Sequence, residues 1–216
     1  MTEIADLPLR CRCGAVRGVA RGASPAKVNH CFCYCDDCQA FAHFLGRADD
    51  VLDAHGGTEI TQMSPASVTF TAGADRIAAI RLTEKGLVRW YASCCNTPIG
   101  NTMAASGVPF IGVVQAFIAA PSAALGPIRG RGFAKSAKGG AAGVPKDGLP
   151  ELVMVARMVG KLLRWRLRGD HKRSELFDAA TGKPLVEPRV LGVAEREELR
   201  RRCARWRGEA APGGSA

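Results

Sequence analysis

The sequence lacks the features of a secreted or membrane-spanning protein. Its first residues, MTEIADLPLRC, carry acidic side chains and lack the basic start and apolar run of a secretory signal, so we expect a cytoplasmic protein. The segment GLPELVMVARMVGKLLRWRLRG has Arg157 and Lys161 in its middle, which makes it a poor transmembrane span. No internal repeat is present. With 216 residues, 47% of them hydrophobic, the chain can form one sizeable core, and we expect a folded soluble protein.

Phosphate-binding motifs and a histidine-based metal site are also missing. Ala134 stands where a Walker sequence needs glycine, and GRGFAK lacks the last glycine of a dinucleotide fingerprint. His30, His43 and His55 have no second histidine at ligand spacing. We therefore expect these three histidines to be structural or solvated.

Cysteine, in contrast, is abundant. The chain has 9 cysteines, and four of them lie close together in NHCFCYCDDCQAF, residues 29–41. Thiols stay reduced in the cytosol, so closely spaced cysteines there indicate metal ligands rather than disulfides. Zinc is the leading candidate, because it suits thiolate-rich sites and needs no redox partner. We expect two zinc ions.

The cysteines other than Cys31 and Cys203 form three closely spaced groups, which are Cys11 and Cys13, then Cys33, Cys35 and Cys38, then Cys94 and Cys95. In the first pair, one intervening residue lets both sulfurs project from the same face of an extended segment. The second group offers three convergent thiolates. In the third group, a turn after a strand could swing one sulfur toward a distant pair.

Charge divides the chain into two halves. Residues 1–120 carry 10 Lys+Arg and 10 Asp+Glu, so the formal net charge of +10 lies entirely in residues 121–216. Every cysteine except Cys203 lies in the neutral half. We expect a zinc-binding β domain at 1–120, a Gly/Pro/Ala-rich linker or long ordered loop at 121–148, and a basic, mainly helical extension at 149–216.

The local patterns predict a mainly β fold with an α-helical extension. Short apolar runs separated by turn residues (AVRGVA, SVTFTA, IAAIRL and LVRWYA) indicate an antiparallel β domain, and GVPFIGVVQAFI favours a further strand over a helix. Pro150 and Gly169 bracket a predicted helix of about five turns. ELFDAATGKPLVEPRVL predicts two strands around a turn, and AEREELRRRCARWRG predicts a short charged helix.

Three motifs resemble the successive signatures of the glutathione-dependent formaldehyde-activating enzyme family, which includes centromere protein V. They are CRCGAVRG, CYCDDCQAF and RWYASCCNTPIGN, and the resemblance covers roughly residues 9–120. It implies coiled antiparallel β-sheets with two zinc sites. It further implies that Cys33, Cys35 and Cys38 hold a catalytic zinc, and that Cys11, Cys13 and Cys95 hold a structural one.

The third motif departs from the family pattern. Ala92 replaces a cysteine of that pattern and Asn96 replaces a glycine, so the structural site is one ligand short. Cys94 is the nearest substitute, but adjacent residues of an extended chain point to opposite faces, so Cys94 and Cys95 can share an ion only if the backbone bends. Cys31 is the alternative donor for either ion. If it closes the second site, catalysis there is excluded, because a catalytic zinc needs an open position.

A zinc ion held by three thiolates is a weak Lewis acid and suits the binding of a fourth thiolate. The resemblance implies that this thiolate comes from glutathione, or another small thiol, and reacts with formaldehyde or a similar electrophile. We therefore expect a carbon–sulfur lyase of the S-hydroxymethylglutathione synthase type. Arg12, Arg47 or Arg89 could help the anionic peptide to approach.

The basic half allows a different class of function. Its arginines, with Trp165 and Trp206, could make the protein a zinc-stabilised, non-catalytic module that binds nucleic acid or another acidic partner. They could also lie on an anionic membrane. The plainer expectation is a helix whose apolar stripe packs on the β domain and whose basic face is solvated. That stripe comprises Leu152, Val155, Val159, Leu162 and Leu163.

Overall fold

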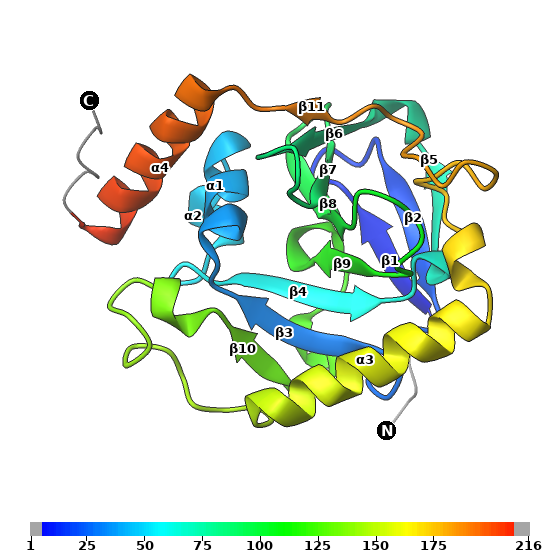
Figure 1. The fold of residues 1–216 in the computed structure, drawn as a ribbon, viewed down its shortest axis with the longest axis horizontal. Helices are drawn as coiled ribbons and strands as arrows, with labels where there is room; N and C mark the ends of the chain where they lie inside the picture. Colours follow the sequence, from blue (N-terminus) through cyan, green and yellow to red (C-terminus); the bar gives the residue numbers. More distant parts are fainter. Residues whose placement is uncertain (1–5, 210–216) are drawn as a thin grey trace.

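The computed structural model describes residues 6–209 and places the strands in two sheets (Figure 1). The smaller sheet is antiparallel, with the order β1-β2-β5, and comprises β1 (Asp6–Arg10), β2 (Arg17–Arg21) and β5 (Val68–Ala72). The larger sheet has the order β10-β3-β4-β9-β8-β7-β6-β11. Its strands are β3 (Asn29–Cys33), β4 (Thr58–Met63), β6 (Ile77–Arg81), β7 (Val88–Ala92), β8 (Thr97–Thr102), β9 (Ile111–Val114), β10 (Gly130–Gly132) and β11 (Arg189–Val190).

The main core lies between the two sheets. In β1, Leu7 and Leu9 are buried while their neighbours are exposed, which is the alternation of a strand with one solvated face. These leucines belong to the same buried cluster as Trp90 of β7, Ile99 of β8 and Val113 of β9. Every residue of β8 is buried, because this strand lies in the interior of the larger sheet.

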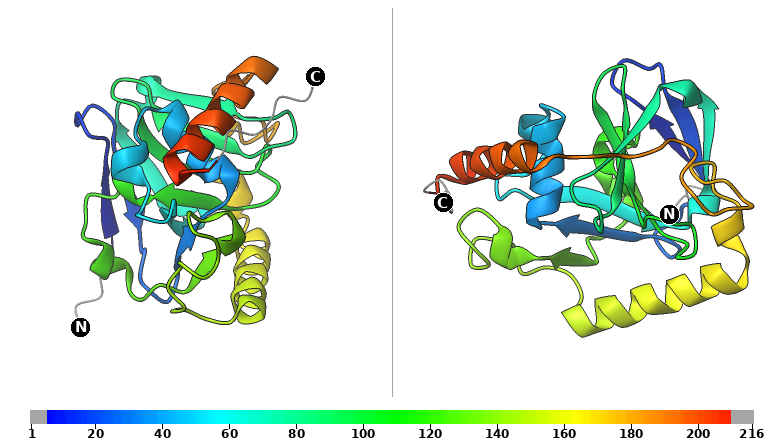
Figure 2. Two further views of the ribbon diagram at one scale, coloured as in Figure 1. Left: turned by 90° about the vertical axis from the view of Figure 1, so that its left-hand side faces the viewer. Right: turned by 45° about the horizontal axis from the view of Figure 1, so that its top comes forward.

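Four α-helices surround the sheets, namely α1 (Asp36–Phe44), α2 (Ala48–Val51), α3 (Glu151–Leu167) and α4 (Val193–Arg207). Short 3-10 turns occur at Pro65–Ser67, Ala74–Arg76, Gln115–Phe117, Ser122–Leu125, Ala134–Ser136 and Asp170–Lys172. Helix α4 lies beside α1, and α3 runs along another side of the molecule (Figures 1 and 2).

The antiparallel strands predicted from the sequence are confirmed, but the whole fold is mixed α/β. The runs AVRGVA, SVTFTA, IAAIRL and LVRWYA become β2, β5, β6 and β7, and part of GVPFIGVVQAFI becomes β9. The helix after Pro150 and the charged C-terminal helix are also confirmed, as α3 and α4. Within residues 6–209, no helix combines the length and the apolar character that a bilayer crossing requires.

Two of the expectations need correction. The segment 121–148 is more than a connection, because it contributes β10, which pairs in parallel with β3. The hairpin expected in ELFDAATGKPLVEPRVL is reduced to a single bridge between Phe177 and Pro184, and β11 pairs in parallel with β6 instead. Both strands are only two or three residues long, so their own sequences carry too little pattern to reveal a partner distant in the chain.

Helix α3 packs in the opposite orientation to the one expected. Its apolar stripe faces outward, with Leu152 81% exposed, whereas Trp165 is 6% exposed. Arg157 and Lys161 point inward and donate hydrogen bonds to the backbone carbonyl of Ala26. These inward cations satisfy carbonyl oxygens of the loop before β3 that have no strand partner.

Strands β8 and β9 approach each other so closely at Gly100 that a side chain there has no room. A Cβ atom at Gly100 would lie 2.7 Å from the carbonyl oxygen of Gly112, which is closer than a carbon atom can approach without a backbone shift. We expect Gly100→Ala to lower the free energy of unfolding by about 1–3 kcal/mol, in a denaturant titration.

The matched control is Gly107→Ala, in the exposed turn between β8 and β9. A Cβ atom there meets no heavy atom within 4 Å, so the free energy of unfolding should change by less than about 0.5 kcal/mol. Equal effects of the two substitutions would contradict the assigned strand packing.

Candidate metal centres

The first centre brings together cysteines that are more than eighty residues apart in the sequence. Cys11, Cys13, Cys94 and Cys95 have sulfur atoms that all lie within 4.8 Å of one another. The Sγ atoms of Cys13 and Cys94 are 3.3 Å apart, and those of Cys11 and Cys94 are 3.9 Å apart. Four sulfurs around a zinc ion at about 2.3 Å would be about 3.8 Å apart, so this donor set suits a tetrahedral zinc site.

Cys94 and Cys95 are adjacent in the sequence, and they lie in a bend of the backbone. Residues 93–96 form a turn between β7 and β8, and Asn96 has a φ of 54°, in the left-handed region. The Cys95 amide donates a hydrogen bond to the Ala92 carbonyl across this turn. Cys94 and Cys95 are therefore not extended, and both sulfurs reach the same centre. On the opposite side, Gly14, with a φ of 78°, closes the turn that follows Cys13.

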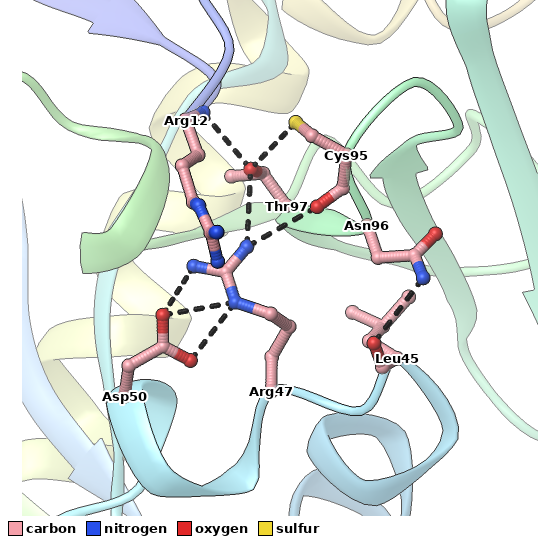
Figure 3. A network of polar contacts seen from close by, with 7 residues as sticks. All are labelled: Arg12, Leu45, Arg47, Asp50, Cys95, Asn96 and Thr97. Carbon is pink, nitrogen blue, oxygen red and sulfur yellow. Dashed lines mark hydrogen bonds and ion pairs between the residues drawn. The ribbon is translucent and has the colours of Figure 1, made fainter.

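A polar network fixes the third motif around Thr97 (Figure 3). The Thr97 hydroxyl lies 3.1 Å from the Cys95 sulfur and accepts hydrogen bonds from the Arg12 amide and the Arg47 side chain. Burial alone would raise the pKa of Cys95, but hydrogen bonds from Thr97 and Cys13 outweigh it and lower the pKa to about 6. Cys95 is thus prepared to act as a thiolate ligand.

The second centre lies where β3 passes into α1. The sulfur atoms of Cys33, Cys35 and Cys38 all lie within 4.8 Å of one another, and Cys33 and Cys35 are separated by 3.3 Å. Cys35 precedes the first turn of α1, and the Cys38 amide donates back to the Cys35 carbonyl. This turn brings Cys38 toward the pair. The positive end of the helix dipole favours thiolates at this place.

Arg89 provides a buried positive charge beside the second centre. Its guanidinium is 1% exposed and donates to the Cys38 sulfur at 3.7 Å and to the Asn101 side chain at 3.2 Å. Asp37 lies 3.4 Å away as an ion-pair partner. The pKa of Cys38 is lowered well below its ordinary value by hydrogen bonds from Cys33 and Cys35, with Arg89 adding to this effect.

Cys31 belongs to neither centre. It is 3% exposed and packs with Ile60 and Val114 in an apolar cluster. Burial, with a contribution from the charge of Cys38, raises the pKa of Cys31 to about 12. Cys31 is therefore not the donor that closes the second centre, and within residues 6–209 no fourth Cys, His, Asp or Glu joins Cys33, Cys35 and Cys38 in the same group.

The predicted cations are divided between the two centres. Arg12 and Arg47 are at the four-cysteine centre, and Arg47 is paired with Asp50. Only Arg89 adjoins the three-cysteine centre, where its burial keeps it from meeting a ligand in the solvent. Of the histidines, His30 is buried and its Nε2 atom lies 2.7 Å from Glu59, so it has a structural role.

The two centres differ in what they can do. Four sulfurs complete the shell of a structural zinc ion, whereas three sulfurs leave one position for a water molecule or a ligand. The described residues therefore form two cysteine clusters that could each hold a metal ion such as zinc.

A family of unknown function, DUF6151, matches residues 2–188. The chain belongs to DUF6151. A search of curated proteins finds no match to the sequence. The DUF6151 match spans both cysteine clusters and extends through β10 and α3, well beyond the region that resembles the formaldehyde-activating family. In this DUF6151 protein, one family match thus covers both cysteine clusters and the segment that carries α3.

Sequence reasoning overlooked the groups that support the cysteines. From β8, Thr97 contacts Cys95, and Asn101 accepts a hydrogen bond from Arg89 beside the second centre; neither has a side chain typical of a zinc ligand. Asn96 carried a usable signal, because asparagine is the residue after glycine that best tolerates a left-handed backbone, and here it replaces a glycine. That replacement predicts a turn next to Cys95.

The grouping of the cysteines predicts which variants lose metal. We expect two zinc ions per chain in the wild type and one in Cys38→Ser or in Cys94→Ser, since each substitution removes a ligand from one cluster. Cys31→Ser should retain both ions. Zinc content can be measured by elemental analysis of the purified proteins.

Cys203→Ser is the control for a buried thiol outside both clusters, and it should retain both ions. Loss of one zinc ion from Cys31→Ser, with none lost from Cys203→Ser, would mean that Cys31 is a ligand after all.

Proposed function

We propose that this protein is a zinc-dependent carbon–sulfur lyase that acts on adducts between a small thiol, such as glutathione, and formaldehyde or a similar electrophile. The observation that carries the proposal is the cluster of Cys33, Cys35 and Cys38 without a fourth protein ligand in the described chain. The resemblance of three sequence motifs to the formaldehyde-activating family supports it and suggests the substrates.

The three cysteines would hold the ion, and regular secondary structure positions two of them. Cys33 is fixed by β3, which pairs with β4 and β10, and Cys38 is fixed by the first turn of α1. A zinc ion bound here would supply an open position that binds the sulfur of a thiol and favours its deprotonated form. Three thiolates and one Zn²⁺ carry one net negative charge, and the buried Arg89 offsets it.

The proposed reaction is a redox-neutral addition. The thiol sulfur forms a bond to the carbon of formaldehyde, the C=O double bond opens, and the proton lost from the thiol ends on the oxygen. The product is a hydroxymethyl thioether, and the reverse reaction cleaves the carbon–sulfur bond. Asp37 adjoins Cys38 in the sequence, and its carboxylate is about half exposed, so it is the group that we propose to carry the proton.

X-ray absorption at the zinc edge tests the binding step. Adding glutathione should increase the average number of sulfur ligands per zinc ion, because one of the two sites gains a ligand. Cys38→Ser should lose this response, and Cys203→Ser should keep it. If every zinc ion already has four protein sulfurs and ignores glutathione, the second cluster is a structural clamp.

Catalysis is tested separately, by NMR exchange measurements on glutathione and formaldehyde. The wild type should speed the formation and cleavage of the adduct, and Asp37→Asn should lower this rate by about 10²–10⁴-fold if Asp37 carries the proton. Asp36→Asn is the matched control, since this neighbouring carboxylate pairs with Arg207 of α4. Unchanged exchange rates with the wild-type protein would leave the non-catalytic module as the function.

A further inference from the structure

A cavity of about 640 Å³ lies between α3 and the loop that joins β2 to β3. None of the cysteines lines it. Its walls come from residues 21–28, residues 63–67 and the inward face of α3. Figure 2 shows α3 along one side of the molecule, away from α1, which begins at the three-cysteine centre. The cavity is therefore a separate feature from the metal centres.

Positive charge dominates the cavity wall. Six cationic side chains line it, and no aspartate or glutamate does; the six are Arg21, Lys27, Arg157, Lys161, Arg164 and Arg168. Asp170 is buried and pairs with Arg168 and Arg173. The carboxylate of Asp6, which lies opposite Arg21 in the pairing of β1 with β2, accepts a hydrogen bond from the Gly22 amide. Among the side chains that the structure describes, the other five cations have no carboxylate oxygen within 4.0 Å. An anion bound among these like charges would reduce their mutual repulsion.

Two of these cations are held rigidly. Arg157 donates from Nε to the Asn29 side chain at 2.7 Å and from Nη2 to the Ala26 carbonyl at 3.2 Å. Lys161 donates to the carbonyls of Ala26 and Lys27 at 3.0 and 2.7 Å. A guanidinium has five N–H donors and an ammonium has three, so both groups keep donors for a ligand. They are ordered before any ligand arrives, which lowers the entropic cost of binding.

Electrostatic crowding is also visible at Lys161. Burial, together with the charges of Arg157, Arg129 and Arg164, lowers the pKa of Lys161 to about 8. An anion in the cavity would relieve this repulsion and stabilise the charged lysine. A negatively charged ligand would thus add a favourable interaction with the charged form of Lys161.

We infer that this cavity is a binding site for a phosphate-bearing anion with two or more negative charges. Arginine suits such a ligand, because its planar N–H groups match pairs of phosphate oxygens. A single carboxylate has too few acceptor atoms for six cations. The phosphate could belong to a free small molecule or to a lipid headgroup, since the apolar side chains of Leu163 and Leu167 are exposed and each precedes a residue that lines the cavity.

The test uses the full-length, zinc-loaded protein and titrates it calorimetrically with pyrophosphate and with inorganic phosphate. The double variant Arg21→Gln/Arg164→Gln removes two lining cations whose side chains make no hydrogen bond or ion pair within the described chain, so the fold should persist. We expect it to bind pyrophosphate at least about tenfold more weakly than the wild type.

Arg166→Gln/Lys172→Gln is the matched control. These residues lie on α3 and just after it, both are exposed and neither lines the cavity, and the double variant loses the same two charges. Its pyrophosphate affinity should stay within about twofold of the wild type. Failure of the wild type to bind either anion, or equal weakening in both double variants, would overturn the site.

Vesicles identify the source of the phosphate. The protein is sedimented with phosphatidylcholine vesicles that contain phosphatidic acid and, as a control, with vesicles of pure phosphatidylcholine. Binding to the first kind alone would assign the site to a lipid headgroup, provided that Leu163→Ser and Arg21→Gln/Arg164→Gln each abolish this binding. Pyrophosphate binding without vesicle binding would assign it to a soluble phosphate compound. Binding of a single-stranded oligonucleotide that weakens equally in both double variants would show non-specific charge attraction and would overturn the proposal.

Discussion

The convergence of cysteine sulfurs is the constraint on which the architecture of this protein depends. Seven sulfurs are concentrated in two clusters, and as thiolates they could approach so closely only around a cation. Each cluster therefore requires chain reversals that present sulfurs inward. The four-cysteine centre uses turns after Cys13 and at Cys94–Asn96, and the three-cysteine centre uses the junction of β3 with α1.

Helix α1 lies between the two cysteine centres and contacts both. Cys35 and Cys38 lie at its start, and the carbonyl of Leu45, just after its end, accepts a hydrogen bond from Asn96 beside Cys95. From the sheet side, β7 and β8 supply Arg89 and Thr97, which contact one centre each. A displacement of α1 or of these strands would thus disturb both centres. The rigidity of the larger sheet fixes the position of the ligands.

Inward-facing cations serve two different purposes in this protein. Arg89 offsets thiolate charge and is matched by Cys38, Asp37 and Asn101. Arg157 and Lys161 instead satisfy carbonyl oxygens and leave their charge unbalanced. This difference separates a charge that stabilises the fold from charges that are available to a ligand.

Much of the fold and the cysteine grouping could be predicted from local patterns. The short apolar runs specify antiparallel strands, because alternation along a strand records which face is buried. Helices α3 and α4 could be placed from their charge patterns and their bracketing prolines and glycines. Spacing alone also indicated that Cys33, Cys35 and Cys38 converge, since all three lie within a single strand-to-helix junction.

Only the tertiary structure decided which distant groups meet. The placement of Cys31 in an apolar cluster, the bend that joins Cys94 to Cys95, and the parallel pairing of β10 with β3 depend on long-range packing that no local window contains. The orientation of α3 likewise brings Lys161 to the carbonyls of a loop more than a hundred residues away. The sequence by itself thus determined the strands, the helices and the cysteines available as metal ligands, because these follow from neighbouring residues. Their mutual positions, and so the candidate sites, follow from contacts formed only when the chain folds.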